Sequence, residues 1–139
     1  MDAIIGAGGI AKPGDPLLGL LAHGEPKALL PIVGKPMVQW ALDAVAAIER
    51  MENVVIIGLT PEHGLHCGTK PVHYIRSAGS IFDNARAGCA RVLELNPGSR
   101  RTLWVSADLP LLTPPCSTGS STEPCGANTN CITRLSSRA

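Results

Sequence analysis

The feature that most constrains the fold is the alternation of short apolar runs with longer segments of helical periodicity. The apolar runs span residues 3–6, 54–58, 72–75 and 102–107. The run Val54-Val-Ile-Ile-Gly58 has no polar side chain, which is typical of a strand in a parallel sheet covered on both faces. Residues 36–48 and 80–95 instead carry apolar residues at helical spacing. Strands that alternate with helices predict crossover connections and a mainly parallel sheet, and hence an α/β fold.

The boundaries of the two expected helices carry local signals. Pro36 suits the first turn of a helix that continues to about Ile48. Ser80-Ile-Phe-Asp83 resembles a capping box with Asp in its fourth place, so a helix is expected to begin there. Asn96-Pro-Gly98 is expected to end that helix.

Composition and charge exclude several classes of protein. A net charge of +1 gives no electrostatic argument for a nucleic acid or an anionic membrane as the main partner. The longest apolar stretch, residues 28–48, is interrupted by Lys35, Gln39 and Asp43, so no membrane span is expected. The beginning Met1-Asp2 does not resemble a secretory signal. We therefore expect a cytoplasmic protein.

The five cysteines predict neither a disulfide framework nor a zinc site. Their number is odd and no two of them form a C-x-x-C pair. Cys89 lies on an expected helix, where it is interpreted as a small core residue.

The last 26 residues differ in composition from everything before them. Residues 114–139 contain five Ser, four Thr and three of the five Cys, and their few aliphatic residues have no period. Such a segment buries too little apolar surface to offset its ordering entropy, so we expect disorder there. We therefore expect two parts in the chain, a folded part over residues 1–113 and a tail over residues 114–139. The abrupt change suggests the hypothesis of a truncated or out-of-frame C-terminus.

Three groups of residues are candidates for chemistry. Gly6-Ala-Gly-Gly9 follows the first strand, where successive N–H groups can form a concavity for an anion; the alternative is a plain turn. Lys27 lies between Pro26 and an apolar run, so its ammonium would be presented from a restrained backbone; the alternative is a solvated lysine. Asp108 stands just past the last expected strand, where open α/β sheets place their ligands. Its alternative is a helix or turn cap.

Together these motifs resemble the MobA-like nucleotidyltransferases. The resemblance rests on three stretches in order and covers about residues 2–114: Gly6-Ala-Gly-Gly9, Pro26-Lys27-Ala-Leu-Leu-Pro31-Ile-Val-Gly34-Lys-Pro36 and Asp108-Leu-Pro-Leu-Leu112. It implies a Rossmann-like, three-layer α/β/α domain in the form of a truncated nucleotidyltransferase fold. It also implies binding of a nucleoside triphosphate (NTP) and a phosphorylated acceptor, a sugar phosphate or a cofactor precursor. The acceptor phosphate would attack the α-phosphorus, and pyrophosphate would leave.

The resemblance also assigns roles to individual residues. Ala7, Gly8 and Gly9 would contact the nucleotide through their backbone groups. Lys27 would stabilise charge on the phosphates, and Asp108 would ligate Mg²⁺. The last two are the expected catalytic residues.

Two further assignments depend on how this sequence departs from the family pattern. The family usually places an Arg after the glycine loop, and here Lys12 is expected to take its place at the triphosphate. A lysine lacks the guanidinium fork that binds phosphate through two parallel bonds. Gly79 is expected near the nucleoside, together with Ser80 and Asn84, although the capping role already accounts for Ser80.

Two functions from different classes remain open on the sequence. The first is a Mg²⁺-dependent nucleotidyltransferase. The second is a catalytically incomplete nucleotide-binding fragment that acts as an assembly or interaction module. If the C-terminus is truncated, the last expected strand loses its covering elements, and we expect a homo-oligomer whose interface buries the strand around Trp104, because an uncovered sheet edge promotes pairing with another chain.

Overall fold

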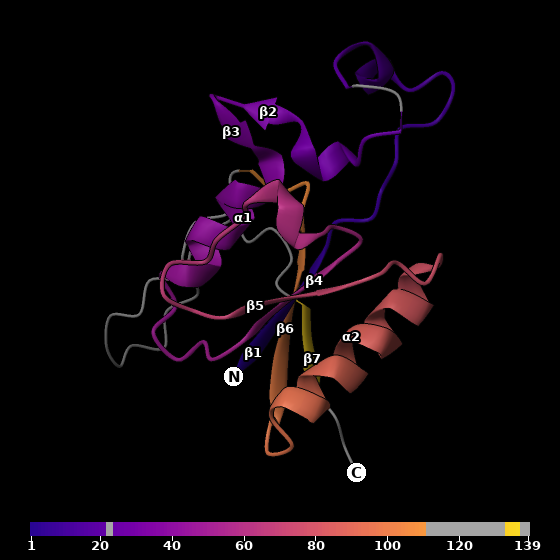
Figure 1. The fold of residues 1–139 in the computed structure, drawn as a ribbon. Helices are drawn as coiled ribbons and strands as arrows, with labels where there is room; N and C mark the ends of the chain where they lie inside the picture. The colour runs from indigo at the N-terminus through magenta and orange to yellow at the C-terminus, as the bar shows by residue number, and fades with distance from the viewer. Residues whose placement is uncertain (22–23, 111–132, 137–139) are drawn as a thin grey trace, which may run out of the picture.

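The structure is a computed structural model that describes residues 1–21, 24–110 and 133–136. Its centre is a five-stranded sheet in the order β5-β4-β1-β6-β7 (Figure 1). The strands are β1 (Asp2–Gly6), β4 (Val54–Ile57), β5 (Val72–Ile75), β6 (Arg101–Ser106) and β7 (Thr133–Ser136). The first four strands pair in parallel, and β7 runs antiparallel to β6. The prediction of a mainly parallel α/β sheet is confirmed.

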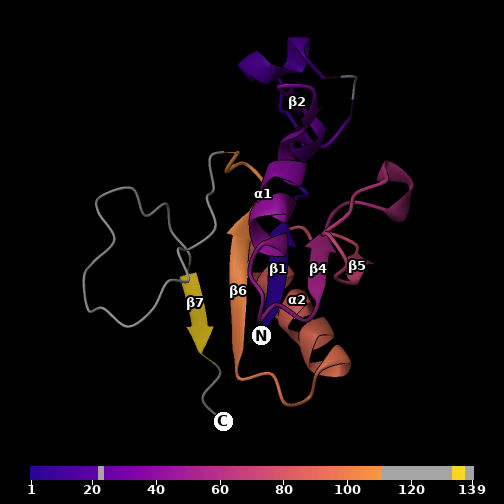
Figure 2. The same ribbon diagram turned by 90° about the vertical axis from the view of Figure 1, so that its left-hand side faces the viewer.

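Two helices cover opposite faces of this sheet, which makes three layers (Figure 2). Helix α1 (Met37–Ala46) packs through Val38, Leu42 and Val45 onto a core that includes Ile5 and Ile56. Helix α2 (Ile81–Leu95) covers the other face, where the core is formed by Ile4, Val55, Ile57 and Val92. Neighbouring positions of one strand thus serve different layers, as the alternation of side chains along a strand requires. The predicted α/β/α architecture is confirmed.

Helix α2 begins and packs as its sequence demands. The Ser80 hydroxyl accepts a hydrogen bond from the backbone N–H of Asp83 (3.1 Å), which caps the helix as predicted. At Gly88 the helix comes so close to the sheet that a Cβ would lie 2.9 Å from Ile4 Cγ2. A larger residue at position 88 would push the helix off the sheet.

A small hairpin that the sequence analysis did not predict precedes α1. Strands β2 (Pro31–Ile32) and β3 (Lys35–Pro36) pair antiparallel around a turn at Val33 and Gly34. The indole N–H of Trp40 donates to the carbonyl oxygen of Ile32 (3.0 Å), which fixes the hairpin on α1. Short 3-10 turns complete the chain at η1 (Pro16–Gly19), η2 (Lys27–Leu29) and η3 (Pro61–His63).

The amino-terminal end of the sheet is closed by a buried carboxylate. Asp2 is fully buried, and its oxygens accept hydrogen bonds from the side chains of Asn53 (2.8 Å), Asn96 (3.2 Å) and Ser99. These partners come from the loop before β4, the end of α2 and the loop before β6. Asp2 therefore ties together three segments that are distant in sequence.

Strand β7 lies in the part of the chain for which the sequence analysis expected no regular structure. Residues 133–136 pair along β6, with Thr133 opposite Trp104. Residues 114–132 and 137–139, the rest of the expected tail, lie outside the described residues. Because β7 pairs with the edge of β6, the strand around Trp104 is not the open edge on which the prediction of a homo-oligomer depended.

No helix in the described part of the chain is long and apolar enough to cross a membrane.

Candidate functional site

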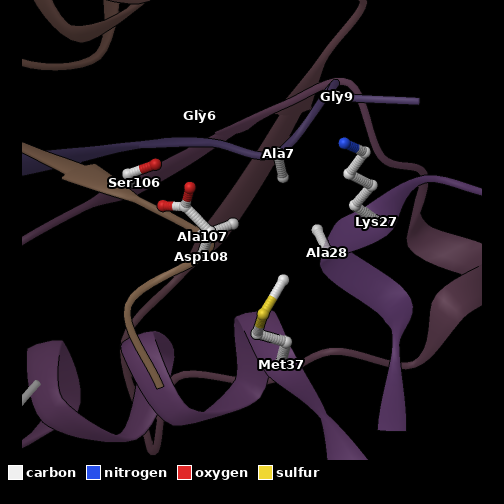
Figure 3. Close-up of a pocket in the computed structure, with 9 residues that line it drawn as sticks. All are labelled: Gly6, Ala7, Gly9, Lys27, Ala28, Met37, Ser106, Ala107 and Asp108. Carbon is white, nitrogen blue, oxygen red and sulfur yellow. The ribbon is translucent and has the colours of Figure 1, made fainter. Parts of the chain in front are cut away.

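A cavity of about 140 Å³ lies at the carboxyl ends of β1 and β6 (Figure 3). From β1 the chain continues to β4 and β5 on one side and then returns to β6 on the other, so the strand order reverses between β1 and β6. Open α/β sheets bind their ligands at such a reversal, outside the carboxyl ends of the strands. The cavity is lined by Gly6, Ala7, Gly9, Lys27, Ala28, Met37, Ser106, Ala107 and Asp108.

The glycine loop after β1 is shaped by close contact with the neighbouring strand. Gly58 follows β4 with φ +94°, and a Cβ on it would lie 2.3 Å from the Cα of Gly8. A Cβ on Gly8 would in turn lie 3.1 Å from the side chain of Ser77. The close approach of the Gly8 backbone thus explains why position 58 has no side chain, whereas a side chain at position 8 would crowd Ser77. The glycine at position 58 is a requirement that the sequence analysis missed.

The backbone groups of the loop differ in what they can offer a ligand. The N–H of Ala7 donates to the carbonyl oxygen of Ile57 (2.9 Å), so the expected backbone contact of Ala7 with a nucleotide would have to use its carbonyl group. The N–H groups of Gly8 and Gly9 have no acceptor among the described residues. Gly9 is exposed, and a Cβ on it would meet no atom within 4 Å. Gly8 and Gly9 therefore keep the backbone donors that an anion requires.

Lys27 is held at the cavity by its backbone and by an ion pair. Its N–H donates to the carbonyl oxygen of Gly9 (2.8 Å), next to a β-bridge between Ile10 and Pro26. These bonds fix the lysine beside the glycine loop, as the restrained backbone around it predicted. Its ammonium forms an ion pair with the carboxylate of Asp15, a contact that the sequence analysis did not predict.

Asp108 lies on the opposite side of the cavity from Lys27 (Figure 3). The N–H of Ala107 donates to the carbonyl oxygen of Gly6 (3.0 Å), which continues the pairing of β6 with β1 up to the site. The side chain of Asp108 is exposed and accepts no hydrogen bond from the described residues. It therefore caps no turn or helix among the described residues, and these residues give no support to the alternative that Asp108 is a cap.

The structure does not bring Lys12 and Gly79 to the cavity. Lys12 is exposed in the turn that leads to Asp15, and it is absent from the lining formed by the described residues. Gly79 lies before α2 with φ +94°, and its N–H donates to the Ser77 hydroxyl (3.4 Å). The side chain of Asn84 accepts a hydrogen bond from the N–H of Ala78 (2.6 Å). The loop before α2 is thus organised by its own hydrogen bonds.

Four lining residues were missed by the sequence analysis. Ala28, Met37 and Ala107 are buried and supply apolar surface, and Ser106 supplies a hydroxyl at the end of β6. Ser106 lies two residues before Asp108, so its position could have been read from the strand that delivers the carboxylate. Met37 could not, because its approach to the cavity depends on where α1 begins relative to β6.

The cavity offers some, but not all, of the oxygen ligands that a hard cation requires. The carboxylate of Asp108 and the hydroxyl of Ser106 are oxygen groups of the kind that Mg²⁺ prefers, and Mg²⁺ typically takes one or two carboxylates plus substrate phosphates. Among the described residues, no three His, Cys, Asp or Glu side chains gather closely enough to hold a metal alone. The site therefore fits a metal that arrives with a phosphorylated ligand.

The thiols of the described residues are poor nucleophiles. Burial raises the pKa of Cys67 to about 11, and its Sγ donates to the carbonyl oxygen of Leu42 (3.4 Å). Burial also raises the pKa of Cys89. Since the thiolate is the reactive form, neither cysteine is suited to redox or nucleophilic chemistry near neutral pH.

Comparison with known sequences identifies one family. Residues 4–117 match the sequence model of a family described as MobA-like NTP transferase domain. The match covers most of the chain and contains the cavity residues. No curated protein sequence matches the chain.

Solved structures of similar fold include several transferases. A hypothetical transferase from Thermus thermophilus has 28% sequence identity and a TM-score of 0.55 over 81% of this chain and 41% of its own. A nucleotidyl transferase from Methanothermobacter has 16% identity and a TM-score of 0.55 over 81% of this chain and 52% of its own. A CMP:2-keto-3-deoxy-manno-octonic acid synthetase in complex with CTP has 20% identity and a TM-score of 0.53, over 81% and 42%. The chain thus spans about half the length of the structures it resembles.

Proposed function

The chain belongs to the family of MobA-like NTP transferase domains, and from this premise we propose that its cavity binds the phosphates of a nucleoside triphosphate for nucleotidyl transfer. In the proposed reaction, an oxygen of a phosphorylated acceptor forms a bond to the α-phosphorus of the NTP. The bond between the α-phosphorus and the bridging oxygen breaks, and pyrophosphate leaves with that oxygen. The acceptor is a small phosphorylated molecule, such as a sugar phosphate.

The observation that carries this proposal is that a cation and a carboxylate lie on opposite walls of one cavity, at the point where the strand order reverses. Lys27 supplies a cation fixed beside the backbone donors of Gly8 and Gly9, which suits a chain of phosphates. Asp108 supplies a carboxylate on the other wall, and it has no partner among the described residues. A cation and a carboxylate are the groups needed to hold a phosphate and a metal bound to it.

In this proposal Lys27 and Asp108 have different tasks. Lys27 binds and orients the phosphates and offsets the charge that develops as pyrophosphate leaves. Asp108, with Ser106 beside it, holds Mg²⁺ together with the phosphates. The metal, when bound, neutralises charge on the phosphate oxygens. Lys12 and Gly79 are not part of the proposed contact set, because the described cavity does not include them. Gly8 is kept although it is not in the lining either, because it joins the lining residues Ala7 and Gly9 and its N–H has no acceptor among the described residues.

A second candidate function is a nucleotide-binding part that requires further structure for turnover. The cavity of about 140 Å³ is smaller than the roughly 300–1,000 Å³ of typical small-molecule sites. The chain also spans only 41% and 52% of two transferases that it resembles. A site of this size accommodates part of an NTP, which favours phosphate binding without acceptor binding.

One assay separates the two candidates. Release of pyrophosphate is measured with each of the four common NTPs, Mg²⁺ and a panel of sugar phosphates, and the melting temperature is measured with the same NTPs. Turnover that is lost in Asp108→Asn and kept in Glu62→Gln, an exposed carboxylate outside the cavity lining, supports the transferase. NTP-dependent stabilisation without turnover supports the binding part. The absence of both results would contradict the proposal.

A further inference from the structure

The ion pair between Asp15 and Lys27 joins the proposed phosphate site to the loop that follows the glycines. The loop leaves β1 at Gly6, makes a β-bridge between Ile10 and Pro26, and returns to the cavity at Lys27. Within it, a turn closed by a hydrogen bond from the N–H of Asp15 to the carbonyl oxygen of Lys12 (2.9 Å) directs Asp15 back. The Asp15 side chain is 16% exposed and the Lys27 side chain 33% exposed. The carboxylate is thus the more buried partner.

We infer that Asp15 is a built-in competitor that occupies the Lys27 ammonium until a polyphosphate displaces it. The inference rests on the proposed function of the cavity, because it assigns a further residue to the same anion site. Lys27 is the cation of the described cavity lining, and the carboxylate of Asp15 takes up its charge. A phosphate that approaches Lys27 meets the negative charge of Asp15 at short range, and like charges repel most strongly where solvent is partly excluded.

Two consequences follow from this arrangement. The binding of a phosphate chain to Lys27 includes the cost of breaking an existing ion pair, so the observed affinity is lower than Lys27 alone would give. Binding also releases the Asp15 side chain from Lys27, so occupation of the site is linked to the segment around Asp15. Asp15 is therefore a positioning residue for Lys27 in the empty site and a selectivity residue against weakly charged anions.

The chemistry of the ligand follows from the competition. An anion with a single charge gains little over the carboxylate that it must replace. Neighbouring phosphates present several charges, and they also reach the N–H groups of Gly8 and Gly9, which Asp15 leaves without an acceptor among the described residues. The arrangement thus favours di- and triphosphates over monophosphates.

The test is a double-mutant cycle on the full chain with inorganic tripolyphosphate as the probe. Dissociation constants are measured by titration calorimetry for the unaltered protein, Asp15→Asn, Lys27→Met and the double variant, at low and at high salt. Asp15→Asn is expected to bind tripolyphosphate about three- to fivefold more tightly, the range of a partly exposed ion pair. Lys27→Met is expected to bind weakly, and Asp15→Asn is expected to have no effect in that background. Glu62→Gln removes the same charge away from the lysine and controls for net charge.

The outcomes distinguish this inference from the proposed function. Equal or weaker binding by Asp15→Asn, with binding still dependent on Lys27, overturns the competitor role and leaves the phosphate site intact. A tightening that persists in the Lys27→Met background, or equally in Glu62→Gln, also overturns it, because the effect would then be general. Absence of tripolyphosphate binding in every variant overturns the phosphate site itself. If Lys27→Met does not fold, as judged by its melting transition, Lys27→Gln replaces it. The expected gain in tripolyphosphate affinity of Asp15→Asn is smaller at high salt, because salt screens a partly exposed ion pair.

Discussion

Each end of the sheet carries an aspartate, and the two aspartates have opposite environments. At the amino-terminal end, the carboxylate of Asp2 is fully buried and accepts hydrogen bonds from three side chains. At the carboxyl end, Asp108 is exposed beside a cavity and accepts none from the described residues. The closed end stabilises the fold, because a buried carboxylate is tolerated only when it is satisfied. Under the proposed function, the open end keeps its polar groups for a ligand, and stability and ligand binding then depend on opposite ends of the strands.

The largest expected effect tests the open end. Asp108→Asn should lower Mg²⁺-dependent pyrophosphate release on the order of a thousandfold, because the variant loses the charge that holds the metal. It should change the free energy of unfolding by less than about 0.5 kcal/mol, as is usual for an exposed position. Rates and urea denaturation of the same preparations check both statements. A large loss of stability would break the comparison, because Asp108 would then have a structural role as well.

The next effect tests the closed end. Asp2→Ala should lower the free energy of unfolding by about 3 kcal/mol, because it removes the buried common acceptor of the half-buried amides of Asn53 and Asn96 and of the Ser99 hydroxyl. Urea denaturation measures the change. Glu52→Gln is the control, since Glu52 is exposed and shares the Asn96 donor (2.6 Å). A loss no larger than that of the control would show that the network contributes little.

A third effect tests how the open end is built. Gly58→Ala should lower the free energy of unfolding by about 2 kcal/mol. It should also weaken tripolyphosphate binding, because the new Cβ would lie 2.3 Å from the Cα of Gly8 and would force the Gly8 backbone to move. Gly14→Ala separates strain from collision, since Gly14 has a similar φ of +88° and open space around it. The control should cost about 1 kcal/mol and come from backbone strain alone. Equal losses in both variants would mean that the contact with Gly8 does not matter.

The smallest effect concerns a third aspartate, which lies between the two extremes. Burial opposes ionisation of Asp43, but hydrogen bonds from Lys35 and Gln39 and the charge of Lys35 outweigh it and lower the pKa of Asp43. A lowered folded-state pKa contributes stability above the unfolded value, about 3.9, and this contribution is lost as the pH falls through the folded pKa. The stability difference between the unaltered protein and Asp43→Asn should therefore be present at pH 6 and shrink toward pH 3. Urea midpoints across this range measure it, and a difference that grows on acidification would contradict the assignment.

The elements that the sequence predicts well are those with a local cause. Apolar runs and helical spacing predict four strands and two helices, and the capping signal at Ser80 gives the start of α2 to within one residue. The hairpin between β2 and β3 escapes prediction because its turn uses Val33 at φ +49°, a conformation that β-branched residues rarely adopt. Strand β7 escapes because four residues in a polar tail carry no pattern of their own.

The candidate site is predicted in part for the same reason. Lys27 and Asp108 can be chosen from their positions after a restrained segment and a strand, and the structure brings both to one cavity. The pairing of Lys27 with Asp15 cannot be predicted, because it depends on how a loop without periodicity folds back. Gly8 is assigned to a ligand by resemblance, whereas the structure shows that its backbone leaves no room for a side chain at position 58. Contacts between segments distant in sequence decide what local patterns leave open.

The β-bridge between Ile10 and Pro26 also has a consequence for how this protein can be changed. The bridge holds the two ends of the loop together. The position of Lys27 therefore does not depend on how many residues lie between Asp15 and Pro26. Doubling a flexible loop costs only about 0.6 kcal/mol in closure entropy. The exposed segment around Leu20 is therefore a place where an insertion, such as an affinity handle or a reporter peptide, can be accepted while the cavity keeps its geometry.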